Sequence, residues 1–85
     1  MIDVTPRLTV FVRRGCHLCT DMTQALERLR SELGFEYSEV DVDRDPDLLS
    51  RYDTRVPVLA AGDTEICYYF LEEQRLRAYL QSLHC

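Results

Sequence analysis

The stretch Arg13-Arg14-Gly15-Cys16-His17-Leu18-Cys19 decides how the rest of this 85-residue chain is interpreted. An apolar run, Leu8–Val12, comes directly before it and predicts a strand that is covered on both faces. An amphipathic run from about Cys16 to Leu33 follows and predicts a helix, because its apolar residues recur at helical spacing. The sequence therefore predicts two cysteines, three positions apart, at a strand-to-helix junction.

The position of Cys16 at this strand-to-helix junction favours a reactive sulfur. The first backbone N–H groups of a helix have no partner within the helix and carry partial positive charge. The thiolate form of Cys16 is favoured there, and Arg13 and Arg14 immediately before it act in the same direction. Because the thiolate is the reactive form, we expect Cys16 to be a nucleophile, with Cys19 close enough to close a disulfide.

The rest of the chain predicts three further strands and two further helices. We expect a strand over Phe35–Val42, a helix from Pro46 to about Asp53-Thr54, strands over Val56–Ala60 and Thr64–Tyr69, and a helix over about Glu72–Leu83. Gly34 should end the first helix in the left-handed conformation, and Asp45 should cap the second. The order β-α-β-α-β-β-α predicts a single α/β domain over residues 1–85, with a four-stranded mixed sheet flanked by three helices.

Apolar side chains at helical spacing predict which helix faces meet the core. In the first helix these are Leu18, Met22, Ala25, Leu26, Leu29 and Leu33. In the last helix they are Leu76, Tyr79, Leu80 and Leu83. Cys67 lies in a predicted strand, so we expect it in the core, whereas Cys85 is the last residue and should be exposed.

Charge and hydropathy exclude several classes of partner. The net charge of −5 argues against nucleic acid, since phosphate backbones require a basic surface. No apolar run approaches the ~20 residues that span a bilayer, and the first residues lack the apolar segment of a signal peptide. We therefore expect a cytoplasmic protein without membrane contact.

The element order, with Cys16-His17-Leu18-Cys19 after the first strand and Val56-Pro57 before the third, resembles the thioredoxin fold, and the compact size resembles a glutaredoxin. The resemblance implies that Cys16 attacks a substrate disulfide and Cys19 resolves the mixed disulfide. It also implies that the Val56-Pro57 bond is cis and faces the sulfurs, with the backbone of Val56 pairing to the substrate. We further expect a monomer that needs no bound cofactor and acts on a disulfide-containing protein or a small-thiol substrate.

Three features of the sequence depart from the glutaredoxin pattern. His17 and Leu18 stand where proline and an aromatic residue are common, and Arg55 stands where threonine precedes Val-Pro. The Gly-Gly turn that holds the γ-glutamyl end of glutathione has no counterpart, because residues 68–73 read Tyr-Tyr-Phe-Leu-Glu-Glu. Glutathione is therefore a weakly supported partner.

Alternatives remain open for the cysteine pair and its neighbours. Cys16 and Cys19 could bind a metal ion or an iron–sulfur cluster, or simply be small buried residues, but the other candidate ligands, His17, Cys67, His84 and Cys85, lack typical metal-site spacing. His17 could stabilise the thiolate or face water, and Arg14 could bind a substrate carboxylate or be solvated. A carrier and a non-catalytic interaction module are thus the alternatives to an oxidoreductase.

Overall fold

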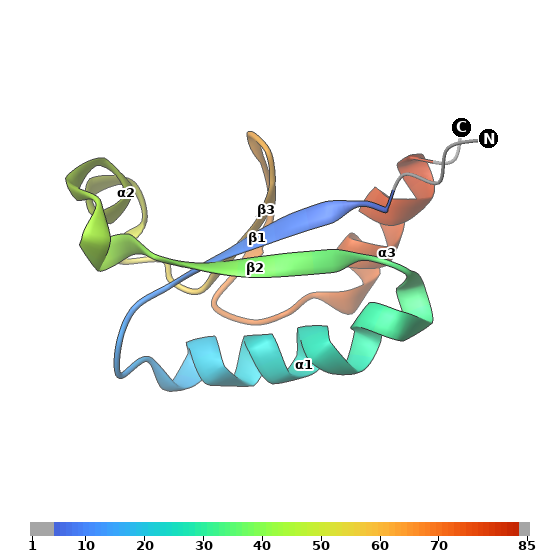
Figure 1. Ribbon diagram of the computed structural model, residues 1–85, viewed down its shortest axis with the longest axis horizontal. Helices are drawn as coiled ribbons and strands as arrows, with labels where there is room; N and C mark the ends of the chain where they lie inside the picture. The colour runs from blue at the N-terminus through green and yellow to red at the C-terminus, as the bar shows by residue number, and fades with distance from the viewer. Residues whose placement is uncertain (1–4, 84–85) are drawn as a thin grey trace.

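The computed structural model describes residues 5–83 as a four-stranded mixed sheet with helices on both sides (Figure 1). The strands are β1 (Arg7–Val12), β2 (Glu36–Asp41), β3 (Val58–Ala61) and β4 (Thr64–Tyr68), in the order β2-β1-β3-β4. β1 pairs with β2 in parallel, whereas β3 is antiparallel to both β1 and β4. The predicted α/β class and mixed sheet are confirmed.

Three α-helices and one short 3-10 helix accompany the strands. α1 (His17–Leu33) connects β1 to β2, η1 (Val42–Arg44) and α2 (Pro46–Tyr52) lie between β2 and β3, and α3 (Glu73–Ser82) follows β4. The predicted end signals are confirmed. Gly34 has a left-handed φ of 76° at the end of α1, and the Asp45 side chain accepts a hydrogen bond from the backbone N–H of Asp47 at the start of α2.

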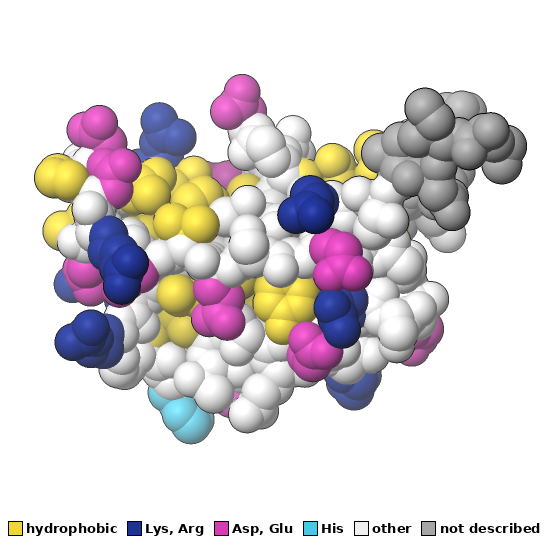
Figure 2. All heavy atoms as spheres, viewed as in Figure 1, with side chains coloured by type: hydrophobic (Ala, Val, Ile, Leu, Met, Phe, Trp, Pro, Cys, Tyr) yellow, Lys and Arg dark blue, Asp and Glu magenta, His cyan; other side chains and the backbone are white. Residues whose placement is uncertain are grey.

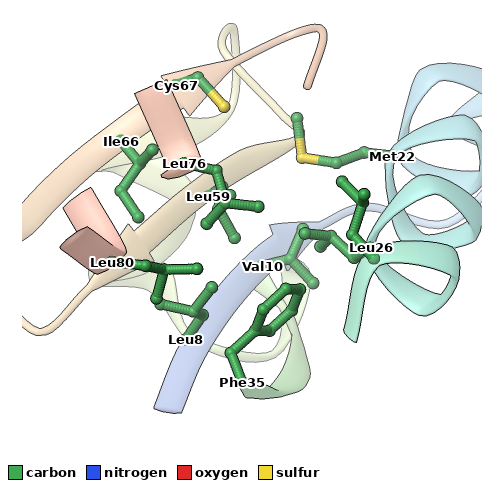
Figure 3. Packing of buried hydrophobic residues seen from close by; sticks show 11 residues of the cluster. Leu8, Val10, Met22, Leu26, Phe35, Leu59, Ile66, Cys67, Leu76 and Leu80 are labelled. Carbon is green, nitrogen blue, oxygen red and sulfur yellow. The ribbon is translucent and has the colours of Figure 1, made fainter. Parts of the chain in front are cut away.

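Side-chain alternation in the strands creates two cores on opposite faces of the sheet. Leu8 and Val10 of β1 face a large cluster with α1 and α3, which Figure 3 shows converging with residues of β3 and β4. Phe11 faces the other side, where a smaller cluster joins Val58 to Tyr52 of α2, and the Phe11 and Tyr52 rings stack at 4.4 Å. In Figure 1, α1 accordingly lies below the sheet and α2 above it.

Several strand ends differ from the sequence prediction: the starts of β1 and β2 and the end of β3 by one residue each, and three others for physical reasons. β2 stops at Asp41, whose carboxylate caps η1, so Val42 is buried in the smaller core without belonging to the strand. β3 begins two residues later than predicted, at Val58. β4 ends at Tyr68, because Tyr69 adopts a left-handed φ of 66° that a strand does not permit.

The predicted burial of apolar residues also differs from the structure at the start of α1 and just after α3. Leu18 was expected in the core but is half-buried, because Cys19, with 4% exposure, begins the buried face of α1. Leu83 follows the last residue of α3 and is 48% exposed, so its predicted core position is wrong. Cys67 is 2% exposed, which confirms its predicted place in the core, while Cys85 lies outside the described residues.

Strand direction brings the predicted site residues to one end of the sheet. Phe11 near the end of β1 pairs with Val58 at the start of β3, so the loop after β1 and the loop before β3 leave the sheet together. β2 is parallel to β1 and ends at the same side. The segment after β4 also begins there, because the backbone N–H of Tyr69 donates to the Pro57 carbonyl at 2.9 Å.

Candidate active site

Cys16 is the N-cap of α1. Its extended backbone (φ −91°, ψ 108°) follows Gly15, whose φ of 74° is left-handed and suits glycine. The Cys16 sulfur accepts a hydrogen bond from the backbone N–H of Cys19 at 3.0 Å. The sulfur therefore satisfies one of the unpaired N–H groups of the first helical turn, as the sequence predicts.

Cys16 and Cys19 form a disulfide, with their Cα atoms 5.2 Å apart. Their exposures differ, since Cys16 is half-buried and Cys19 is buried. A substrate approaching from solvent therefore meets the sulfur of Cys16 first. This difference fits a nucleophile on the surface and a resolving thiol behind it.

The three neighbouring polar residues occupy different environments. The guanidinium of Arg13 pairs with the Asp43 carboxylate at 3.1 Å, so its charge is already compensated. Arg14 is exposed and has no ion pair or hydrogen bond among residues 5–83. The His17 side chain is 90% exposed, and its Nε2 lies 3.8 Å from a carboxylate oxygen of Asp21. Arg14 is therefore the basic group at this junction that remains available to a substrate anion.

The Val56-Pro57 peptide bond is cis, as the resemblance implies. Val56 is half-buried and Pro57 is buried. Their loop lies at the same end of the sheet as Cys16 because of the β1–β3 register. Neither residue lines the cavity beside the two cysteines, however, so the structure places the predicted site residues at one end without bringing all of them into one hollow.

Aromatic residues after β4 fix the loop that contains Pro57. Tyr69 donates its hydroxyl proton to the Thr54 carbonyl at 2.6 Å, in addition to its backbone hydrogen bond to Pro57. Its ring contacts that of Tyr68 edge to face, with centroids 4.9 Å apart, and the Arg55 guanidinium lies 5.9 Å from the Tyr68 ring centroid. A bulky aromatic segment therefore occupies the region in which the glutaredoxin pattern has a glycine turn.

A cavity of about 340 Å³ opens beside the disulfide. The β1–α1 junction and the first turns of α1 supply most of its lining, and β2 supplies one carboxylate; the polar and reactive groups are Arg13, Cys16, His17, Cys19, Thr20, Thr23 and Glu39. Sequence reasoning missed Glu39, which is 23 residues from Cys16. The strand alternation of Tyr37, Glu39 and Asp41 was the available signal.

Comparison with known proteins identifies the family. Residues 7–81 match the family described as Glutaredoxin-like domain (DUF836). The chain belongs to this glutaredoxin-like family. It is 35% identical over 78 residues to the uncharacterized protein Rv0508 of Mycobacterium tuberculosis, with 86% of this chain and 80% of that protein covered.

Solved structures support the same assignment. The solution structure of protein Ne2328 from Nitrosomonas europaea is 38% identical, with a TM-score of 0.80 over 93% of this chain and 96% of that one. A thioredoxin from Fasciola hepatica is 20% identical, with a TM-score of 0.57 over 89% of this chain and 78% of that one, and shows the fold alone. The glutaredoxin-like chain thus has a thioredoxin-type fold, and its Cys16–Cys19 pair fits thiol–disulfide chemistry.

Within residues 5–83 of this glutaredoxin-like chain, no three His, Cys, Asp or Glu side chains are grouped as a metal site would require. His84 and Cys85, two of the candidate ligands, lie outside the described residues. No helix in the same range is long and apolar enough to cross a membrane.

Cys67 differs chemically from the redox pair. Its thiol is buried and free, and burial raises its pKa above the ordinary value. The folded protein therefore keeps the proton on this thiol at pH values where the unfolded chain loses it. Above the ordinary thiol pKa of about 8.5, this difference should lower the free energy of unfolding as pH rises.

We expect Cys67→Ala to remove that contribution. The stability advantage of the oxidised wild type over oxidised Cys67→Ala should shrink as pH rises through and above the ordinary thiol pKa. Urea unfolding of both proteins across this range measures the difference, and all other titrating groups are shared. A difference that stays constant with pH would contradict the assigned protonation of Cys67.

The hydroxyl of Tyr69 should contribute measurably to stability. We expect Tyr69→Phe to lower the free energy of unfolding by about 0.5–1.5 kcal/mol, the net contribution of one hydrogen bond, because the Thr54 carbonyl loses its side-chain donor while the ring at position 69 still contacts the Tyr68 ring. Tyr79→Phe is the matched control, since the Tyr79 hydroxyl has no hydrogen-bond partner in the described part of the chain. Chemical denaturation should place the control within about 0.5 kcal/mol of wild type, and equal losses in both variants would contradict the proposed role.

Proposed function

We propose that this glutaredoxin-like protein is a thiol–disulfide oxidoreductase that uses a dithiol mechanism. One observation carries the proposal: the half-exposed Cys16 sulfur caps α1, accepts the Cys19 N–H hydrogen bond, and is bonded to a buried second sulfur. The helix start stabilises negative charge on this sulfur after reduction, which supports nucleophilic attack.

The reaction proceeds in two exchanges. The Cys16 thiolate attacks one sulfur of the substrate disulfide, forms a mixed disulfide and releases the other substrate sulfur as a thiolate, which takes a proton from water. The deprotonated Cys19 sulfur then attacks the Cys16 sulfur and releases the second substrate thiolate. The substrate gains two electrons and two protons, and the protein ends as the Cys16–Cys19 disulfide. A thiol reductant returns it to the dithiol form by the reverse exchanges.

The surroundings of the sulfurs suggest how a substrate is held. Arg14 is available for a substrate carboxylate, and His17 lies on the exposed first turn of α1. The backbone of Val56, next to cis Pro57, is proposed to pair with the chain that carries the substrate disulfide. The aromatic segment after β4 and the acidic start of α3, where Glu72 pairs with Arg75, favour substrates other than glutathione.

Trapping the mixed disulfide tests the assignment of the two roles. Reduced Cys19→Ser should form a stable adduct on Cys16 when mixed with a small disulfide labelled by mass, because the resolving sulfur is absent. Reduced Cys16→Ser is the matched control and should form no adduct at Cys19 in the folded state, since Cys19 is buried. Peptide mapping locates the adduct. An equal or larger adduct at Cys19 in the control would overturn the assigned roles.

A further inference from the structure

One carboxylate in the cavity beside the disulfide has no partner. Within the described range, residues 5–83, the carboxylate of Glu39 makes no hydrogen bond and no ion pair, while its backbone belongs to the β1–β2 ladder. It lines the same hollow of about 340 Å³ as Cys16 and Cys19. An unpaired charge that lines the same hollow as a reactive sulfur is a candidate contact for a substrate, because a substrate of opposite charge would compensate it.

The sheet register explains how Glu39 reaches this hollow. Glu39 of β2 lies beside Val10 of β1 in the parallel ladder, and Val10 faces α1. Tyr37, two residues earlier on the same face of β2, donates its hydroxyl proton to the Glu27 carboxylate of α1 at 3.0 Å. Glu39 therefore lies on the helix-facing side of the edge strand, at the level of the first turns of α1.

Among the charged side chains that line the hollow, the Glu39 carboxylate has no ion-pair partner within residues 5–83. Of the basic groups in the lining, Arg13 is paired with Asp43 at 3.1 Å and His17 lies 3.8 Å from a carboxylate oxygen of Asp21. Arg30, farther along α1, pairs with Glu27 and Glu36. Figure 2 shows acidic and basic side chains interspersed over the visible face, so no large basic patch lies across this view. A cationic group thus has a favourable partner in the lining of the hollow, whereas the unpaired cation at this junction, Arg14, lies outside that lining.

We propose that this cavity binds the cationic end of a low-molecular-weight disulfide, with Glu39 as its ion-pair partner. The inference rests on the proposed function, because the bound molecule is the substrate of Cys16. The volume is at the low end of the ~300–1,000 Å³ range of ligand pockets, which suits one half of a small aminothiol disulfide. Thr20 and Thr23 in the lining provide hydroxyl oxygens that can also accept from an ammonium group.

The chemistry of this substrate class follows the two exchanges already described. One aminothiol half becomes bonded to Cys16 while the other half leaves as a thiolate and is protonated. Attack by Cys19 on the Cys16 sulfur then releases the second half. The disulfide receives two electrons and yields two aminothiol molecules, and dithiothreitol supplies the electrons in the assay by becoming a cyclic disulfide. Glu39 forms no covalent bond in these steps and acts only by attracting the cationic end of the substrate.

Three small disulfides of matched length test the proposal. Cystamine is cationic, bis(2-hydroxyethyl) disulfide is neutral, and 3,3′-dithiodipropionate is anionic. Values of kcat/KM are measured for each with dithiothreitol, after subtraction of the uncatalysed rate, for wild type, Glu39→Gln and Asp63→Asn. Asp63 is an exposed carboxylate in the β3–β4 turn, outside the cavity lining, so it controls for the change in net charge.

We expect Glu39→Gln to lower the ratio of kcat/KM for the cationic disulfide to kcat/KM for the neutral disulfide by about two- to five-fold, the range of one exposed ion pair. The corresponding ratio for the anionic disulfide to the neutral one should rise. Comparing ratios between variants cancels the intrinsic reactivity of each disulfide. The effect should vanish near 1 M salt, where the screening length is about 3 Å. Asp63→Asn should keep the wild-type ratios.

Two results overturn the inference and are distinguishable. If wild type reduces the neutral disulfide but Glu39→Gln leaves the ratios unchanged, or Asp63→Asn changes them equally, the cationic site is wrong and the oxidoreductase function stands. If wild type accelerates the reduction of none of the three disulfides, the proposed oxidoreductase function is wrong, and the cationic site that rests on it is wrong as well.

Discussion

Replacing Cys16 with serine should reduce disulfide turnover by about 10³-fold or more, the scale on which loss of an enzyme's nucleophile is felt. The hydroxyl of serine has a far higher pKa than a thiol, so the helix start cannot supply an anionic nucleophile at neutral pH. Cys19 cannot substitute, since it is 4% exposed. Reduction of bis(2-hydroxyethyl) disulfide, followed spectrophotometrically with excess dithiothreitol, measures the loss.

Cys67→Ala provides the control for this result. It also removes one thiol, but from a buried site outside the redox pair, so turnover should stay near the wild-type value. A Cys16→Ser protein that keeps more than about a tenth of the wild-type rate would contradict the assignment of the nucleophile. An equally large loss in Cys67→Ala would point instead to the buried thiol or to a folding defect, and thermal unfolding of both variants separates these explanations.

The core beneath the site should be sensitive to shortening of Leu26. Leu26 is fully buried where α1 packs on the sheet, in the cluster shown in Figure 3. We expect Leu26→Ala to lower the free energy of unfolding by about 2–5 kcal/mol, because the lost apolar contacts leave a cavity. Urea unfolding of the oxidised protein, monitored by circular dichroism, measures this change.

Leu83→Ala is the matched substitution on the surface. Leu83 is 48% exposed just after α3, so its replacement should change the unfolding free energy by no more than about 0.5 kcal/mol. The comparison also tests the corrected end of α3, since the helical spacing alone predicts Leu83 in the core. Similar losses in the two variants would show that the Leu83 side chain is packed in the core.

Elements with both a periodic pattern and an end signal could be predicted from the sequence. α1 combines an apolar stripe with Gly34 as its stop, and α2 begins with Asp45 and Pro46. Strand ends were predicted less well, because β-forming residues continue past the last ladder hydrogen bond. Val42 and Tyr69 are such residues, yet a capped turn and a left-handed backbone end the strands before them.

The nucleophile was predictable for a local reason, whereas the rest of the site depends on tertiary structure. Cys16 caps the helix that directly follows it, so the chemistry is encoded within a few residues. Glu39 approaches the cysteines only through the register of β2 against β1. The hydrogen bonds of Tyr69 to Thr54 and Pro57 likewise join segments that no short sequence pattern connects.

Redox titration with mapping of the cysteine pairs tests the central claim most directly. Reduced protein is equilibrated with a series of dithiothreitol or glutathione redox buffers, quenched with acid, alkylated and mapped by mass spectrometry. We predict one reversible two-electron transition in which Cys16 and Cys19 become linked to each other while Cys67 stays a free thiol. A Cys16 and Cys19 pair that remains reduced in oxidising buffers, or a disulfide of either one with Cys67 or Cys85 instead, would contradict the proposed dithiol mechanism.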